Sequence, residues 1–163
     1  MKLLTLFFVF ILSTASEGAY YDSYCKKIYT VELKETWLSE KIDKLKSNDV
    51  NVFPSAALSL SCYPDNTKQY IPEMIERFDV QHGEARLEII SIVAHYKEHA
   101  VPYLVESLKS KNIDVRRGAC MALRTIGPKA KAALPALKEL LSEPGYDVSM
   151  KAKRAIESIQ GGI

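Results

Sequence analysis

The sequence predicts an all-α fold in which about four helix pairs stack side by side as a solenoid. Three observations lead to this prediction. A block of sequence recurs at a shift of 33 or 30 residues, a length suited to one pair of helices. Within each block the apolar residues return at intervals of three and four, as on one face of a helix. Proline opens the first segment of several blocks, and Gly127-Pro128 closes one of the second segments, as expected at helix boundaries.

The repeat is clearest when residues 101–126 are compared with residues 134–159. At a shift of 33, both blocks open with an apolar residue followed by proline, and both continue to an Asp-Val dipeptide and alanines. A shift of 30 brings residues 72–96 onto the same pattern, and a weaker copy begins near residue 36. Four helix pairs are therefore predicted across residues 36–163.

Each pair is predicted to have the same internal plan. The first helix begins near a proline, and the second begins at an aspartate, Asp114 or Asp147, whose side chain can cap the free backbone N–H groups. One such second helix carries its apolar face on Val115, Ala119, Ala122, Leu123 and Ile126. A single pair cannot bury this face alone, whereas stacked pairs can. The small alanines let neighbouring helices approach closely, so a charge at Ala119 or Ala122 should be poorly tolerated.

Residues 1–19 are predicted to be a signal peptide outside the fold. Lys2 supplies a positive charge, an apolar run of about ten residues follows it, and small residues come next. Cleavage is expected between Ala15 and Ala19. A membrane-spanning helix needs about 20 apolar residues, so an uncleaved anchor or a core helix is the less favoured alternative. The mature chain is expected to be exported, either periplasmic or secreted, with no membrane span.

Export changes the interpretation of the cysteines. In an oxidising compartment Cys25 and Cys62 can form a disulfide, although two free thiols remain an open alternative. Residues 20–35 are rich in tyrosine and are predicted to cap the N-terminal end of the solenoid. Cys120 lies in a helical pattern and is expected to behave as a small buried apolar residue.

The motifs of residues 100–160 resemble the HEAT repeat, specifically the short HEAT-like type of phycobilisome lyases. The matching motifs are Ala100-Val-Pro-Tyr-Leu-x3-Leu108, Asp114-Val-Arg-Arg-Gly-Ala-x2-Ala-Leu-x2-Ile-Gly127 and Ala133-Leu-Pro-Ala-Leu-x3-Leu141 with Asp147-Val148. The resemblance implies right-handed superhelical stacking and, most often, protein–protein recognition. In such repeats an arginine at the position of Arg116 pairs with the capping aspartate of its own or the adjacent unit, Asp114 or Asp147. The last unit departs from the pattern at Ser149 and Gln160, as a terminal capping unit does.

The resemblance also places the second helices on the concave side of the stack. The face opposite the apolar core then becomes a candidate binding surface, with the candidate residues Leu87, Arg117, Met121, Arg124, Met150 and Arg154. Methionine surfaces adapt to different partners, and basic surfaces accept acidic peptides or other anions. The alternative is that the arginines only solvate the helices.

One motif points to metal chemistry. Residues 95–99 read His-Tyr-Lys-Glu-His, which is formally an H-x-x-E-H zinc motif. Tyr96, however, falls on a core position, His99 falls in the turn that follows, and the sequence shows no clear third ligand. Ordinary exposed histidines are therefore expected, with no metal site, no cofactor and no catalytic residue.

The net charge of +2 conceals an asymmetry. Residues 21–106 carry 10 Lys and Arg against 14 Asp and Glu, whereas residues 107–163 carry 11 against 5. Such a dipolar chain favours the steering of a partner by charge. The small net charge gives no reason to expect nucleic-acid binding. The sequence thus predicts a monomeric, non-catalytic module that binds a protein or peptide partner, with acidic partners favoured by the basic half. The alternatives are a periplasmic inhibitor or immunity protein for one specific partner and, by family analogy alone, a bilin-lyase-like enzyme.

Overall fold

The computed structural model describes residues 23–25, 35–143 and 146–161. The predicted signal peptide and most of the predicted cap segment lie outside these ranges. Every regular element within them is a helix. The α-helices are α2 (Glu35–Leu45), α3 (Phe53–Ser61), α4 (Pro64–Thr67), α5 (Ile71–Glu76), α6 (Gly83–His95), α7 (Val101–Ser107), α8 (Ile113–Ile126), α9 (Leu134–Glu139) and α10 (Tyr146–Ile159). None of the described helices combines the length and the apolar character that crossing a membrane requires.

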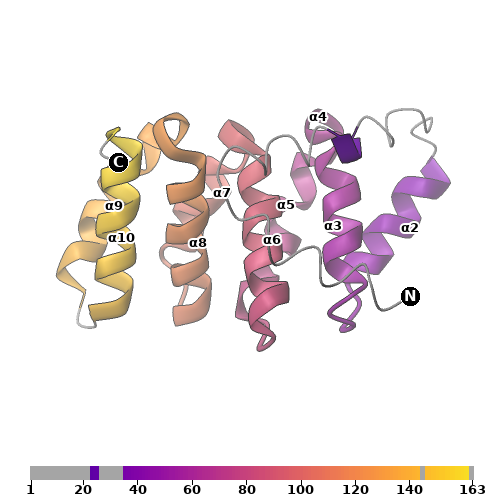
Figure 1. The fold of residues 1–163 in the computed structure, drawn as a ribbon, viewed down its shortest axis with the longest axis horizontal. Coiled ribbons are helices and arrows are strands. Elements are labelled where there is room, and N and C mark those ends of the chain that lie inside the picture. Colours follow the sequence, from indigo (N-terminus) through magenta and orange to yellow (C-terminus); the bar gives the residue numbers. More distant parts are fainter. Residues whose placement is uncertain (1–22, 26–34, 144–145, 162–163) are drawn as a thin grey trace.

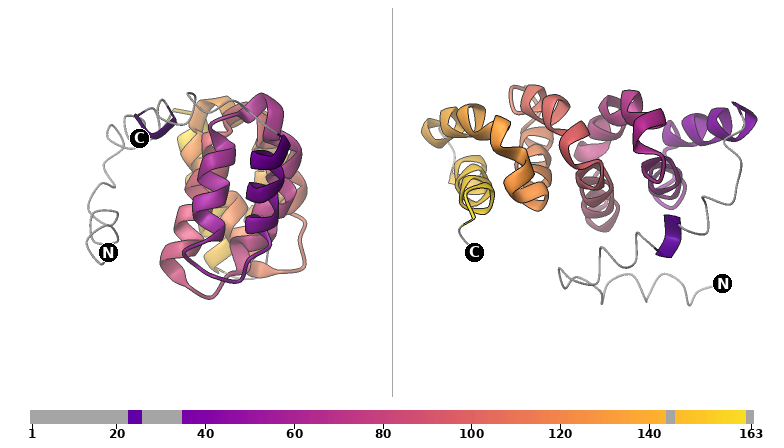
Figure 2. Two further views of the ribbon diagram at one scale, coloured as in Figure 1. Left: turned by 90° about the vertical axis from the view of Figure 1, so that its right-hand side faces the viewer. Right: turned by 90° about the horizontal axis from the view of Figure 1, so that it is seen from above.

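The helices form two layers along one axis. Helices α3, α6, α8 and α10 stand side by side in one row, and α2, α5, α7 and α9 lie behind them (Figure 1). The view from above shows the row of α3, α6, α8 and α10 on the inner side of a gentle curve (Figure 2). We call α3, α6, α8 and α10 the inner helices. The predicted all-α solenoid of four helix pairs is therefore confirmed.

The first helices of the pairs are shorter than the repeat pattern predicts. Helix α5 has six residues and continues as a 3₁₀ turn at Arg77–Asp79, and α9 is preceded by a 3₁₀ segment at Gly127–Ala133. Between the first and second pairs the chain also forms the single-turn helix α4 and a 3₁₀ turn at Lys68–Tyr70, which the repeat comparison did not predict. In the last three pairs the second helix, of 13 or 14 residues, is longer than the first, of six or seven, whereas in the first pair α2 has 11 residues and α3 has nine.

The starts of the inner helices correct the predicted caps. Helix α8 begins at Ile113, and the side chain of Asn112 accepts a hydrogen bond from the backbone N–H of Asp114 at 2.9 Å. Asp114 is thus the second residue of the helix, and Asp147 holds the same position in α10. Aspartate in a first turn still interacts favourably with the helix dipole. The carboxylate of Asp114 is therefore not the cap of α8, and Asp147 likewise lies inside α10.

The predicted end of the third inner helix is confirmed. Helix α8 ends at Ile126, and Gly127 follows with φ of 65°. This left-handed conformation carries little cost for glycine, which has no Cβ. The turn at Gly127 leads the chain back to the outer layer, where α9 begins.

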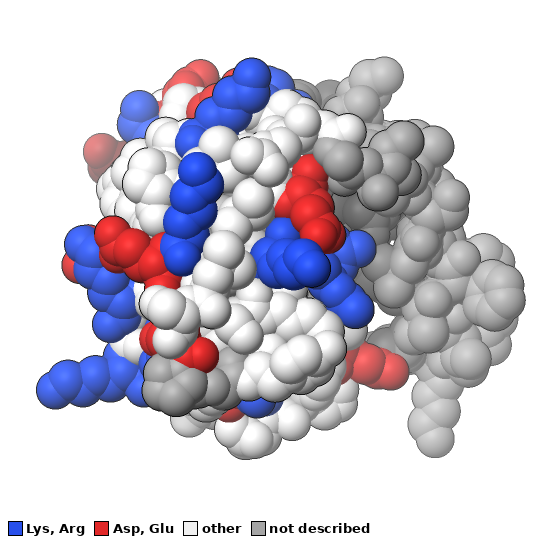
Figure 3. Space-filling model, turned by 90° about the vertical axis from the view of Figure 1, so that its left-hand side faces the viewer, with Lys and Arg blue, Asp and Glu red and all other residues white. Residues whose placement is uncertain are grey.

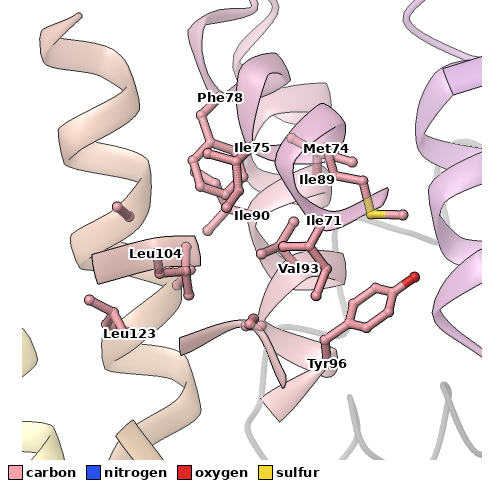
Figure 4. Close-up of a cluster of buried hydrophobic side chains, with 14 of the residues drawn as sticks. Ile71, Met74, Ile75, Phe78, Ile89, Ile90, Val93, Tyr96, Leu104 and Leu123 are labelled. Carbon is pink, nitrogen blue, oxygen red and sulfur yellow. The ribbon is translucent and has the colours of Figure 1, made fainter. Parts of the chain in front are cut away.

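The core is continuous along the solenoid. Figure 4 shows its central part, where side chains from α5 and α6 meet Leu104 of α7 and Leu123 of α8. Ala119 and Ala122, the two alanines of the predicted apolar face, are fully buried. The hydroxyl of the buried Tyr96 forms a 2.9 Å hydrogen bond with Thr67 of α4, which connects the second pair to the inserted turn. Each helix pair therefore covers the apolar face of the next one.

A disulfide joins Cys25 to Cys62 at the C-terminal end of α3, with the two Cα atoms 5.1 Å apart. The neighbouring Tyr24 hydroxyl lies 3.2 Å from the hydroxyl of Ser59 in α3. The predicted pairing of these cysteines is present in the structure. Cys120 is a buried free thiol, and burial raises its pKa to about 12.

The close approach of Phe78 to α8 gives a test of the packing. A Cβ added to Gly118 would lie 2.8 Å from Cγ of the fully buried Phe78 ring, well inside van der Waals contact. We expect Gly118→Val to lower the free energy of unfolding by about 1–3 kcal/mol, because overpacking forces the ring to shift. Urea unfolding followed by circular dichroism measures this change.

Gly83 provides the matched control, because a Cβ there meets nothing within 4 Å. Gly83→Ala should keep or slightly raise the stability, since alanine is the better helix former. Equal stability of the Gly118→Val variant and the native chain would contradict the packing described here.

Candidate functional site

The inner helices present two opposite faces. In α8, Ala119, Ala122 and Leu123 are fully buried against the outer layer. Arg117, Met121 and Arg124 follow one another at intervals of four and three residues, so they share the opposite face of the helix. In α10, Met150 holds the position of Arg117, and Arg154 holds the position of Met121. In α6, Leu87 holds the position of Arg117. We call this surface of α6, α8 and α10 the inner face.

The structure brings the six predicted binding residues onto the inner face with different exposures. Leu87 is 49% exposed, and Arg124 and Arg154 are also exposed. Arg117, Met121 and Met150 are half-buried. At the N-terminal end of the row the corresponding residues of α3, which are Pro54, Leu58 and Ser61, are buried. The accessible part of the inner face therefore lies on the last three pairs.

Arg117 is the centre of an ion-pair ladder across three helices. Its Nη1 lies 3.0 Å from Oδ1 of Asp114, and its Nε pairs with Oδ2 of Asp147 on α10. Asp114 also lies 3.3 Å from Nη1 of Arg86 on α6, and Asp147 lies 3.6 Å from Nζ of Lys151. These five residues form what we call the ladder. Each carboxylate of the ladder lies between two cations, and the ladder connects α6, α8 and α10.

The ladder corrects the role predicted for Arg116. Its Nε lies 3.3 Å from Oε1 of Glu143, and its Nη1 donates to the carbonyl oxygen of Ser110 at 2.7 Å. The arginine that pairs with Asp114 and Asp147 is the next residue in the chain, Arg117. The reason is geometric, because adjacent residues on a helix point about 100° apart. Arg116 therefore faces the loop of the last pair, whereas Arg117 faces the inner surface.

Arg86 is a ladder residue that the sequence analysis missed. The shift of 30 residues places Arg86 at the position of Arg116, and that signal was available in the sequence. Both arginines donate to the carbonyl oxygen six residues earlier, Arg86 to Val80 at 2.9 Å and Arg116 to Ser110 at 2.7 Å. Arg86 in addition reaches Asp114 of the following pair. Comparison of the two arginines would have predicted the contact between α6 and α8.

Two arginines of the inner face remain available to a partner. Within the part of the chain that the structure describes, neither Arg124 nor Arg154 has an ion pair with a carboxylate. Both side chains are exposed. An unpaired guanidinium can bind a carboxylate through two parallel hydrogen bonds. The two arginines are therefore the exposed cations that this face offers, and the exposed Glu157 holds the place of Arg124 in α10.

The zinc-like motif has structural partners instead. Tyr96 is buried in the core, Oε1 of Glu98 lies 2.6 Å from Nζ of Lys129, and Nε2 of His99 lies 3.4 Å from Oδ1 of Asp65. The ion pair with Lys129 lowers the pKa of Glu98. Across the described residues, no group of three or more His, Cys, Asp or Glu side chains is arranged to hold a metal ion.

Comparison with known proteins gives one family and several solved structures. A family model described as HEAT repeats matches residues 71–157, more than half of the chain. An engineered protein of the Northeast Structural Genomics Consortium is similar at 22% identity and a TM-score of 0.45, over 77% of this chain and 63% of the other. A designed armadillo repeat protein in complex with peptide (KR)4 is similar at 19% identity and a TM-score of 0.46, over 75% and 64%. The chain thus spans less than two thirds of either structure. No curated protein matches it.

The ladder can be tested by removing its central cation. Arg117→Gln keeps a polar, unbranched side chain that suits a helix but leaves the carboxylates of Asp114 and Asp147 with one fewer cation each. We expect the free energy of unfolding to fall by about 1 kcal/mol, because partly exposed ion pairs contribute about 0.2–1 kcal/mol each. Urea unfolding at low salt measures the loss, and about 1 M NaCl should shrink it by screening.

Arg124→Gln is the matched control on the same helix face. Arg124 has no ion pair in the described residues, so its substitution should change the stability by less than about 0.5 kcal/mol. If both variants lose the same stability at low salt, the ladder does not hold the inner helices together.

Proposed function

The chain belongs to the HEAT-repeat family, and on that basis we propose that it is a non-catalytic scaffold whose inner face binds a protein or peptide partner. The observation that carries this proposal is the pair of exposed arginines, Arg124 and Arg154, which have no carboxylate partner in the described residues. The same face carries the half-buried Met121 and Met150 and the exposed Leu87. Such a mixture of unpaired charge and accessible apolar surface is typical of a binding site.

The rigidity of the inner face supports the same function. The ladder joins α6, α8 and α10, and the hydroxyl of Ser158 in α10 donates to the carbonyl oxygen of Arg124 in α8 at 2.9 Å. A surface fixed in this way loses little conformational entropy when a partner binds. The partner is proposed to be acidic, because acidic groups would complement Arg124 and Arg154.

A non-catalytic role agrees with the state of the reactive residues. Burial raises the pKa of Cys120 to about 12, so the thiol carries almost no nucleophilic thiolate at neutral pH. Within the zinc-like motif, Glu98 pairs with Lys129 in the 3₁₀ segment after α8, and His99 lies 3.4 Å from a carboxylate oxygen of Asp65 in α4. Because these residues are buried or have partners within the fold, we propose that the chain acts by binding a partner and not by catalysis.

Export is the second part of the proposal, and we propose that the exported chain acts as a monomer. Two features support export: the apolar N-terminal segment of residues 1–19, and the disulfide between Cys25 and Cys62. Disulfides persist in oxidising compartments and are rare where glutathione keeps thiols reduced.

The inner face can be tested by site-specific photocrosslinking in the producing cell. We expect a photoreactive amino acid at Met121 to give a discrete adduct, whereas the same probe at Lys138 on the exposed surface of α9 gives none. Substitution of Arg124 and Arg154 by glutamate should abolish the adduct at Met121, because it reverses the charge offered to the partner. Gel electrophoresis and mass spectrometry detect the adducts. Equal adducts at the two positions, or none at Met121, would overturn the proposal.

Export and the disulfide give a prediction for the mature chain. The intact mass of the chain from the exported fraction should correspond to removal of the first 15 to 19 residues and to the loss of two hydrogens. Alkylation in denaturant without reductant should modify one thiol, that of Cys120. A chain with its N-terminus intact, or one with three reactive thiols, would show that export or the disulfide is wrong.

A further inference from the structure

We propose that the inner face binds an acidic segment that also has an apolar edge, and that it holds this segment in one orientation. The apolar edge lies toward the N-terminal ends of α6, α8 and α10, and the carboxylates lie toward Arg124 and Arg154. This inference rests on the proposed binding function and specifies the chemistry of the partner.

The apolar edge of the surface follows from the exposure of three large side chains. Among the described residues, four large apolar side chains are exposed, and three of them are on the inner helices: Leu87 at 49%, Ile113 at 43% and Tyr146 at 80%. Ile113 and Tyr146 are the first residues of α8 and α10, and they are 33 residues apart, so they hold the same place in successive pairs. Leu87 lies in the second turn of α6.

The basic edge lies farther along the same helices. Arg124 is eleven residues after Ile113 in α8, which corresponds to about 16 Å at a rise of 1.5 Å per residue. Arg154 is eight residues after Tyr146 in α10, or about 12 Å. Arg117 lies between the two edges, but the carboxylates of Asp114 and Asp147 already pair with it. The surface therefore has an apolar band and a separate band in which Arg124 and Arg154 supply the positive charge and Glu157 one negative charge. We call the second one the basic band.

Figure 3 views the C-terminal end of the molecule, where Lys and Arg side chains border a broad area of uncharged side chains. This end of the solenoid adjoins the inner face but is not part of it. On the inner face itself, the charges favour a peptide over a membrane or a nucleic acid. The exposed Glu157 of α10 would repel a phosphate at its position, so the inner face lacks the continuous positive charge that a layer of phosphates needs. A peptide with spaced carboxylates can avoid Glu157.

The spacing of the helices sets the length of the segment. Packed helices lie about 8–10 Å apart, so the path from α6 to α10 is about 20 Å. An extended chain rises about 3.3 Å per residue, so six to eight residues cover this path. Successive side chains of an extended chain point to opposite sides, so alternating apolar and acidic residues would match the two bands.

The test uses three synthetic octapeptides with a fluorescent label and the full disulfide-bonded chain. The first alternates Glu and Leu, the second replaces every Glu by Lys, and the third replaces every Leu by Ser. We expect fluorescence anisotropy to show that the Glu-Leu peptide binds at least about tenfold more tightly than the other two, because only it satisfies both bands. Binding of the Lys-Leu or the Glu-Ser peptide with equal affinity would overturn the inference.

Variants of the chain locate the two edges. Arg124→Gln with Arg154→Gln should weaken the Glu-Leu peptide about tenfold or more, and Tyr146→Ser should weaken the Glu-Leu peptide without affecting the Glu-Ser peptide. Glu157→Gln should strengthen binding, because it removes a like charge, and Lys138→Gln should have no effect. Circular dichroism confirms that each variant is folded. Unchanged affinity for the arginine or the tyrosine variant would contradict the assigned orientation.

Two further outcomes separate this inference from its premises. Crosslinks at Met121 without preference for the Glu-Leu peptide would leave the binding function standing and remove the proposed chemistry of the partner. Vesicles of phosphatidylcholine with phosphatidylserine provide the second measurement. If the chain binds these vesicles and the double arginine variant does not, the surface binds anionic lipid and the peptide proposal is wrong.

Discussion

The structure depends on the close approach of successive helix pairs. No helix pair can bury its apolar face alone, so each pair must lie tightly against the next. The fully buried Ala119 and Ala122 allow this approach, and the absent side chain of Gly118 leaves the space that the ring of Phe78 fills. Larger residues at these positions would push the pairs apart. The spacing and alignment of the inner helices, and with them the shape of the inner face, follow from these small residues.

The ladder is possible only because the packing brings charges of different pairs together. Asp114 is in the first turn of α8, where Arg86 of α6 reaches it from one side and Arg117 lies on its own helix. Arg117 then reaches Asp147, which has the same position in α10. Each contact is partly exposed and contributes little alone, whereas the series fixes how three helices are aligned. Packing thus sets the distance between the pairs, and the ladder adds a directional constraint.

Most of the fold could be predicted from the sequence, but less of the site could. The repeat pattern located the inner helices because their apolar positions and Gly127 depend on local sequence. It missed α4, which occurs once and has no repeated signal. It assigned the pairing with Asp114 and Asp147 to Arg116, because sequence position alone does not show which of two adjacent arginines points toward the next helix. It also missed that Asn112, and not Asp114, caps α8, since both residue types suit that position.

The charge asymmetry of the chain has a different meaning once the ion pairs are known. The basic excess of residues 107–163 suggested a generally basic C-terminal half. Several of these cations are already paired, among them Arg116 with Glu143, Arg117 with two aspartates and Lys129 with Glu98. Among the described residues, the positive charge of the inner face that has no carboxylate partner lies at Arg124 and Arg154. The proposed recognition by charge therefore depends on two side chains at known positions, which a total count over half of the chain cannot locate.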